Sequence, residues 1–344
     1  MSGVAGPDIA RSEGMTNRPA LELVRRAGAL QREYPLAQLA ALLLLFCLGA
    51  ATISGFTQMF SIRSMLILAS LLGISALGQT VCVLIGGLDV SVGGWILAGS
   101  TVSVGLLDGA GAHWSIAEVF LLLGFGSVII GGLAGLVSYR FGVPSLVVTL
   151  AVNGIVTGVV LAWDSSLTGT APPWIATATS AAGRTFGIAM PSVVFIWAAI
   201  AVISYVVLQR SVVGTWIHAT GGNPRAAKLA MIPTTAVWIG AFGLSALAAT
   251  LAGVLLTGFS AGGGTGVGTT YMWNGLTAVI IGGTAFGAQG DYTRTVIGSL
   301  VIIVLSQVLT GYGVGSADQS ILFGALIIVI VGLYLRDRRL RDQI

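Results

Sequence analysis

Charged residues are scarce in this chain of 344 residues. Asp, Glu, Lys and Arg make up only 8% of it, against about 25% in an ordinary soluble domain, while 55% of the residues are hydrophobic. Uncharged runs of about 20 residues, the helix length that crosses a hydrocarbon core, recur along the sequence. The runs Leu42–Phe46 and Ile327–Leu333 do not alternate apolar with polar residues, as a membrane β-barrel would require. The composition predicts an all-α polytopic membrane protein.

The groups that ion coupling and catalysis need are missing from the apolar runs. No charged residue lies between Leu229 and Gly290, so no ionisable side chain there can bind a coupling ion. The single lysine, Lys228, does not stand in a phosphate-binding Gly-rich loop. His113 and His218, the two histidines, fall in loops on opposite sides of the predicted membrane. We therefore expect no enzymatic activity, no bound ATP and no metal in this chain, so a partner must drive any uphill transport.

Cysteine is also rare. Cys47 and Cys82 each lie inside an apolar run and lack the spacing of metal ligands. We expect both to be buried thiols without a functional role, and we expect no disulfide.

The apolar runs predict about ten membrane-spanning helices. Their boundaries carry an error of several residues, because element ends are the weakest part of such a prediction. The predicted spans are 37–55, 64–86, 90–107, 117–138, 143–163, 190–209, 234–257, 271–288, 295–312 and 318–335.

Basic residues give the orientation. An even number of spans puts both basic termini on one side, which the positive-inside rule makes the cytoplasm. Internal basic residues agree, since only Arg63 and Arg184 fall outside. The chain thus divides into a cytoplasmic segment at 1–36, a transmembrane domain at 37–335 and a basic cytoplasmic tail at 336–344. This placement explains the formal charge of +4 without nucleic acid binding.

Glycine, in contrast, is abundant. The chain has 50 glycines, which in a membrane favour closely packed helices. Val83–Gly94 and Val279–Gly290 are alike, and each closes a predicted span at a Gly-Gly pair. This likeness predicts an internal repeat of roughly spans 2–5 and 7–10, with its register open by one span. A chance match of apolar residues before Gly-Gly is the alternative.

A short helix is predicted at about 221–231, in the cytoplasmic connection between the sixth and seventh spans. Two glycines permit a sharp turn there, Asn223 can cap the helix, and Pro224 suits the first helical position because its missing N–H is not needed. Such a helix can insert into a groove of a cytoplasmic partner, or it can be an ordinary interfacial helix. The candidate coupling residues are Gly221, Gly222, Asn223, Pro224, Arg225, Ala226, Ala227 and Lys228.

Three stretches carry recognisable motifs. Gly86–Gly93 reads Gly-Gly-Leu-Asp-Val-Ser-Val-Gly, Ala219–Leu229 contains Gly-Gly-Asn-Pro, and Ala278–Thr284 ends in Gly-Gly-Thr. In this order and spacing they resemble the ribose-type (simple sugar) permease family of bacterial ATP-binding-cassette importers. Arg225 departs from the family, because an acidic residue is usual there. The structural-motif positions are Gly86, Gly87, Asp89, Ser91, Gly282 and Gly283, with Asp89 interpreted as a helix cap rather than an ATPase contact.

The resemblance implies a multisubunit importer in the bacterial inner membrane. It implies a second permease subunit, identical or paralogous, a cytoplasmic ATPase that binds ATP and Mg, and a periplasmic solute-binding protein. The chain would then be the permease subunit that forms the translocation path for a small polar solute, a monosaccharide by analogy with the family. The alternative is a passive channel or facilitator, which needs neither ATP nor a coupling ion.

Polar residues inside the spans are candidates for lining a path. Thr149, Asn153 and Thr157 recur every fourth residue and share one face of the predicted fifth span. Asn274, which stands where the family commonly has Asp, is a fourth candidate. The alternative for the three-residue stripe is helix packing through small polar side chains.

Overall fold

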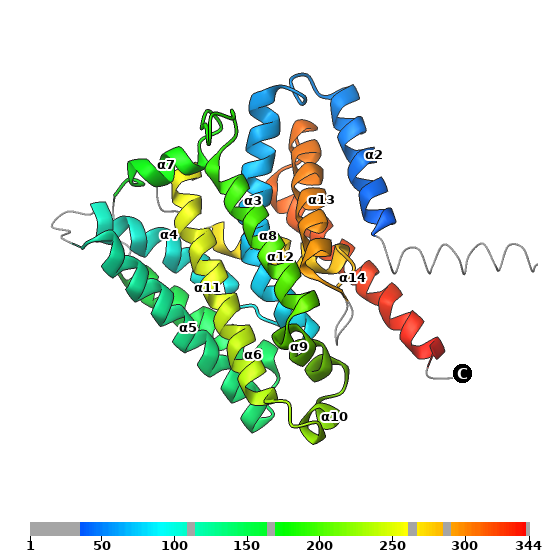
Figure 1. The fold of residues 1–344 in the computed structure, drawn as a ribbon. Coiled ribbons are helices and arrows are strands. Elements are labelled where there is room, and N and C mark those ends of the chain that lie inside the picture. Colours follow the sequence, from blue (N-terminus) through cyan, green and yellow to red (C-terminus); the bar gives the residue numbers. More distant parts are fainter. Residues whose placement is uncertain (1–34, 109–113, 164–168, 261–266, 285–289, 342–344) are drawn as a thin grey trace, which may run out of the picture.

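The chain folds into α-helices. The computed structural model describes residues 35–108, 114–163, 169–260, 267–284 and 290–341 (Figure 1). Within these residues the only β-contact is an isolated bridge between Thr185 and Ile188. The helices are α2 Leu36–Thr52, α3 Met59–Leu84, α4 Val92–Asp108, α5 Ile116–Phe141, α6 Ser145–Trp163, α7 Pro173–Thr179, α8 Ser192–Arg210, α9 Val212–Gly222, α10 Pro224–Leu229, α11 Thr234–Ser260, α12 Val267–Ile281, α13 Tyr292–Gly311 and α14 Ser316–Arg341.

Each predicted span overlaps a helix, and the largest boundary error is at α12. The prediction extended to residue 288, whereas α12 ends at Ile281. Gly283 follows with a φ of +92°, a left-handed conformation that ends the helix and that glycine adopts without steric cost. The predicted C-terminal tail begins inside a helix, because α14 continues to Arg341. The predicted N-terminal segment lies outside the described residues except for its last two.

Helix lengths divide the bundle into two groups. Among the described residues, six helices are long and apolar enough to cross a membrane: α3, α5, α6, α8, α11 and α13. Helices α2 and α4 have 17 residues each and α12 has 15, below the usual length of about 20. The prediction of an all-α polytopic protein is confirmed, but the count of about ten membrane-crossing helices is not.

Helices α3 and α11 form the centre of the bundle. In the most apolar stretch of α3, 83% of the residues are buried, against 17% in α6 and in α8, which therefore lie at the outside. Glycines let the central helices touch. A Cβ added to Gly78 of α3 would lie 2.0 Å from the Cα of Ser245 in α11, and one added to Gly253 would lie 2.3 Å from the carbonyl oxygen of Ile96 in α4. Such contact through small residues is typical of membrane helices.

The two cysteines lie in different environments. Cys82 of α3 is buried as expected, but Cys47 of α2 is exposed, so that expectation was wrong. Helix α2 contacts the bundle through a face that contains the buried residues Gln38 and Gly49. Cys47 points away from this face, which apolar composition alone does not show.

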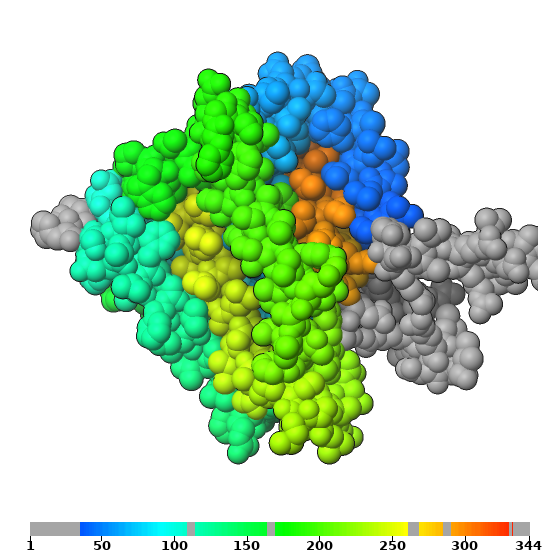
Figure 2. All heavy atoms as spheres, in the orientation of Figure 1, coloured from blue at the N-terminus to red at the C-terminus, as the bar shows by residue number. Residues whose placement is uncertain are grey.

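The bundle has two distinct ends. Helix α7 and the connection from it to α8 lie at one end, whereas α9, α10 and the turn between α5 and α6 lie at the other (Figure 1). The space-filling view shows the α9–α10 region at the surface of that second end, beside the turn between α5 and α6 (Figure 2). Candidate coupling residues therefore gather at one end of the molecule.

Candidate functional site

The predicted helix at 221–231 is two helices that meet at Asn223. Gly221 and Gly222 end α9, and α10 begins at Pro224. Pro224 has no N–H to continue the α9 ladder and disfavours helical backbone at Asn223, which is extended with φ −154° and ψ 96°. The side-chain oxygen of Asn223 accepts hydrogen bonds from the amides of Arg225 at 3.1 Å and Ala226 at 3.0 Å. Capping by Asn223 and the start at Pro224 are confirmed, whereas Gly221 and Gly222, predicted as a sharp turn, are the last residues of α9.

Helix α10 presents most of its surface outward. Ala227 is 3% exposed and packs inward, whereas Arg225, Ala226 and Lys228 are exposed. Just beyond them, Leu229 is 87% and Met231 89% exposed. Two large hydrophobic side chains are thus exposed beside the cationic residues Arg225 and Lys228.

Lys228 connects α10 to α5. Its Nζ lies 5.0 Å from the centre of the Tyr139 ring, within cation–π range. The Tyr139 hydroxyl shares a hydrogen bond with the Thr234 hydroxyl at the start of α11. Tyr139 thus contacts both sides of the α10–α11 connection.

Residues 85–91 form the connection between α3 and α4, called here the motif segment. Gly86 has a φ of +85°, and the Gly87 amide donates to the Cys82 carbonyl at 2.8 Å. The end of α12 repeats this geometry: Gly283 has a φ of +92° and the Thr284 amide donates to the Val279 carbonyl at 3.2 Å. Both Gly-Gly motifs therefore close a helix with a left-handed glycine cap. The wider internal repeat stays a prediction.

Asp89 lies buried in the motif segment, with 2% of its surface exposed. One carboxylate oxygen accepts hydrogen bonds from the Ser91 amide at 2.8 Å and the Ser91 hydroxyl at 2.7 Å. Burial raises the pKa of the Asp89 carboxyl, and the bonds from Ser91 oppose that rise. These bonds hold the backbone just before α4 begins at Val92.

The polar stripe of α6 faces the motif segment and the start of α4. The stripe begins one turn earlier, at Ser145, and supplies hydrogen-bond acceptors to three backbone amides within residues 88–94. The Ser145 hydroxyl accepts from Leu88 at 2.9 Å, the Thr149 hydroxyl from Val90 at 3.2 Å, and the Asn153 amide oxygen from Gly94 at 2.7 Å. Thr157 continues the stripe, 3.3 Å from where a Cβ at Gly94 would stand. The stripe holds non-helical backbone in place, and its role in lining a path stays a prediction.

Gln79 is a buried polar residue that sequence reasoning missed. Its side-chain nitrogen donates to the carbonyls of Asp89 and Met272, each at 3.2 Å, and so bridges the motif segment and α12. Gly275 makes room for it, because a Cβ there would lie 2.4 Å from Gln79 Oε1. Asn274, which precedes Gly275 on α12, is half-buried. Gln79 is the one side-chain amide in α3, a signal that could have identified it.

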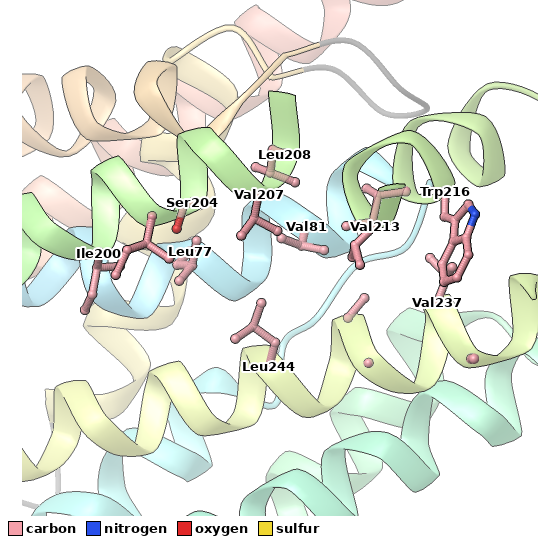
Figure 3. Close-up of a pocket in the computed structure, with 15 residues that line it drawn as sticks. Leu77, Val81, Ile200, Ser204, Val207, Leu208, Val213, Trp216, Val237 and Leu244 are labelled. Atoms are coloured by element: carbon pink, nitrogen blue, oxygen red, sulfur yellow. The ribbon is translucent and has the colours of Figure 1, made fainter. Parts of the chain in front are cut away.

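An apolar groove lies between α3, α8, α9 and α11 (Figure 3). It has a volume of about 530 Å³ and is lined by aliphatic side chains such as Leu77, Val207 and Leu244. The Ser204 hydroxyl and the Trp216 indole are its polar groups. A polar solute needs more hydrogen-bond partners than these two side chains offer, so we do not place the solute path here.

A second hollow lies beside the motif segment. It has a volume of about 580 Å³ and is bounded by Gly86, Leu88, Tyr139, Trp238 and the turn between α5 and α6. The hollow therefore lies between the motif segment and the aromatic residues near α10. Elsewhere, the described residues contain no group of three or more His, Cys, Asp or Glu side chains that could hold a metal ion.

Comparison with known proteins matches most of the chain. Residues 61–331 match the family described as branched-chain amino acid transport system / permease component. The ribose import permease protein of Haemophilus influenzae is 25% identical over 295 residues, covering 85% of this chain and 90% of its own. The fructose import permease protein of Rhizobium meliloti is 30% identical over 294 residues, covering 83% and 79%. An autoinducer 2 import system permease protein of Photorhabdus laumondii is 28% identical over 289 residues, covering 79% and 83%. No solved structure matches the chain.

Proposed function

Because the chain belongs to the family of permease components of ATP-binding-cassette importers, we propose that it forms the translocation path for a small polar solute, a monosaccharide in the first instance. Two of the relatives named above are permeases for ribose and fructose. The polar groups of α6, α3 and α12 around the motif segment, including Asn153, Gln79 and Asn274, are the side chains we assign to the solute path or its support.

All ten main helices, in this proposal, belong to the membrane domain, and both termini are cytoplasmic in the bacterial inner membrane. The distribution of basic residues supports this orientation. Arg140 lies in the last turn of α5, Arg210 ends α8, and Arg225 and Lys228 lie on α10. These helix ends gather at the end of the bundle that carries α9 and α10 (Figure 1), and clustered Lys and Arg favour the cytoplasmic side. The short helices α2, α4 and α12, together with the apolar part of α14, would complete the ten.

Three partners follow from this proposal. A cytoplasmic ATPase, which binds the ATP and Mg, docks on α10 and supplies the energy. A periplasmic binding protein meets the opposite end, near α7, and a second permease subunit completes the path. The single observation that carries the ATPase contact is the exposed surface of α10 and its flank, where Leu229 and Met231 are 87% and 89% exposed.

The proposal is tested by substitution of Leu229. The native chain, Leu229→Asp and Phe186→Asp are co-expressed with the cognate ATPase and compared for ATPase co-purification. Phe186 is the matched control, because it is 89% exposed but lies in the connection after α7, at the opposite end. We expect Leu229→Asp to lose most of the bound ATPase, because a charge would be desolvated in the contact, and Phe186→Asp to retain it.

Uptake decides between driven and passive transport. Vesicles that contain the native chain, the ATPase and the binding protein should import labelled ribose or fructose only when ATP is supplied. In the co-purification experiment, equal ATPase binding by Leu229→Asp and Phe186→Asp would exclude α10 as the contact. Uptake that needs no ATP would instead favour a passive facilitator.

A further inference from the structure

Aromatic side chains form a continuous stack from α10 into the bundle. The aromatic column consists of Tyr139 of α5 with Trp238 and Phe242 of α11. Lys228 Nζ lies 5.0 Å from the Tyr139 ring centre, and the Tyr139 and Trp238 ring centres are 5.5 Å apart. The Trp238 and Phe242 rings are one helical turn apart, 5.6 Å between centres and stacked at 16°. Each step is within the range of a favourable aromatic contact.

The inner end of the column touches the motif segment. A Cβ added to Gly87 would lie 3.0 Å from Cζ of Phe242, which is 1% exposed. Phe242 also belongs to the same buried cluster as Cys82 and Ile85, at the end of α3. The column therefore connects the outward-facing helix α10 with residues 85–91 through side chains in contact at every step.

Helices α5 and α11 support the column as one unit. A Cβ at Gly131 would lie 2.6 Å from the carbonyl oxygen of Phe242, and one at Gly135 would lie 2.5 Å from that of Trp238. Backbones in such close contact have little freedom to slide. A displacement at Tyr139 is thus passed inward rather than absorbed between the two helices.

The motif segment has room to respond. The hollow of about 580 Å³ is lined by Gly86, Leu88, Tyr139, Trp238 and the turn between α5 and α6. The Leu88 and Val90 amides are held by hydroxyl groups of α6 rather than by a helical ladder. Trp238 Nε1 makes no hydrogen bond with another described residue, so movement of its indole breaks none of the described ones.

We propose that Tyr139, Trp238 and Phe242 are positioning residues that transmit displacement of α10 to the motif segment. Docking of the ATPase would thereby change how residues 85–91 are held against the polar stripe of α6. This inference rests on the proposed function of α10 as the ATPase contact. It adds a route from that contact to the buried backbone where α6, α3 and α12 meet, through a physically contiguous network.

The test uses paired substitutions of Tyr139, which is half-buried and lies at the outer end of the column, next to Lys228. Tyr139→Leu removes the ring under Lys228, whereas Tyr139→Phe keeps the ring and loses only the hydroxyl. Each variant is assembled with the ATPase and binding protein, and solute imported per ATP hydrolysed is measured. Hydrogen exchange of a peptide covering residues 85–91 is recorded with and without the ATPase. A parallel pair, Trp238→Leu and Trp238→Phe, probes the middle of the column.

We expect the Tyr139→Leu complex to retain ATPase binding and ATP hydrolysis but to import about 2- to 30-fold less solute per ATP. This is the range by which single contacts in such networks change the coupling between two distant sites. Its 85–91 exchange should no longer respond to the ATPase, and Tyr139→Phe should behave like the native chain. A Tyr139→Leu variant with native transport per ATP and a native exchange response would overturn the inference. A parallel loss of ATPase binding and uptake would also overturn it, as a general structural effect. Absence of ATP-driven uptake in the native complex would instead reject the proposed function.

Discussion

The cap of α10 offers a quantitative test of how this short helix is held. Asn223 accepts hydrogen bonds from the amides of Arg225 and Ala226, at 3.1 and 3.0 Å. The helix has six residues, and so short a helix is marginal by itself because nucleation is costly. Asn223 is exposed, so its replacement leaves no cavity. The effect of a substitution should therefore report the cap alone.

Asn223→Ala removes both hydrogen bonds and should cost about 1 kcal/mol, within a range of about 0.5–2 kcal/mol. That range corresponds to a fall of about 2- to 30-fold in the ratio of helical to frayed α10. Asn223→Ser keeps a capping oxygen and is the matched control, because Ser and Asn are similar at this position. Hydrogen exchange of residues 224–230 should accelerate by this factor in the Ala variant only, with ATP-driven uptake reduced in the same order. Identical exchange and uptake in the Ala and Ser variants would refute the reasoning.

Two further predictions concern a hydrogen bond to the motif segment and the packing of α3 on α11. Thr149→Val removes the hydroxyl that accepts a hydrogen bond from the buried Val90 amide, and the unpaired amide should cost about 1–3 kcal/mol. The detergent-solubilised Val variant should therefore unfold at a lower temperature than the native chain, whereas Thr149→Ser should not. Equal unfolding temperatures of the Val and Ser variants would contradict this role of Thr149. Gly78→Ala forces a Cβ to 2.0 Å from the Cα of Ser245 and should destabilise the α3–α11 contact by about 1–3 kcal/mol or more. Gly126→Ala is its control, because no atom lies within 4 Å of the added Cβ. Size-exclusion profiles recorded after heating compare the stability of the two variants. Native stability of Gly78→Ala would show that α3 and α11 can separate freely.

Local signals in the sequence predicted local structure well. Asn223 followed by Pro224 predicted the start of α10, because capping and the missing proline N–H act within a few residues. The same short-range reasoning did not join Gly221 and Gly222 correctly to the preceding helix α9. It also extended α12 past Gly283, because apolar residue counting does not register a left-handed turn.

Contacts between distant segments could not be predicted from one sequence. Fourfold spacing identified the face that carries Thr149 and Asn153, but not that this face meets the backbone of residues 88–94. The ring contact between Tyr139 and Trp238 joins α5 to α11 across 98 intervening residues, and no local pattern indicates it. The exposure of Cys47 depends likewise on which face of α2 meets the bundle. Apart from Gln79, the polar groups of the candidate site were identified from the sequence, whereas their partners depend on how the helices pack.

The central claim is that this chain is the path of an importer driven by a separate ATPase through α10. Uptake of labelled ribose and fructose is measured in vesicles that contain the native chain, the ATPase and the binding protein, with ATP and with no nucleotide, beside matched vesicles carrying Leu229→Asp. Accumulation above the external concentration in the native vesicles only, and only with ATP, is the predicted result. Equilibration of the sugar without ATP, equal in native and Leu229→Asp vesicles, would contradict the claim.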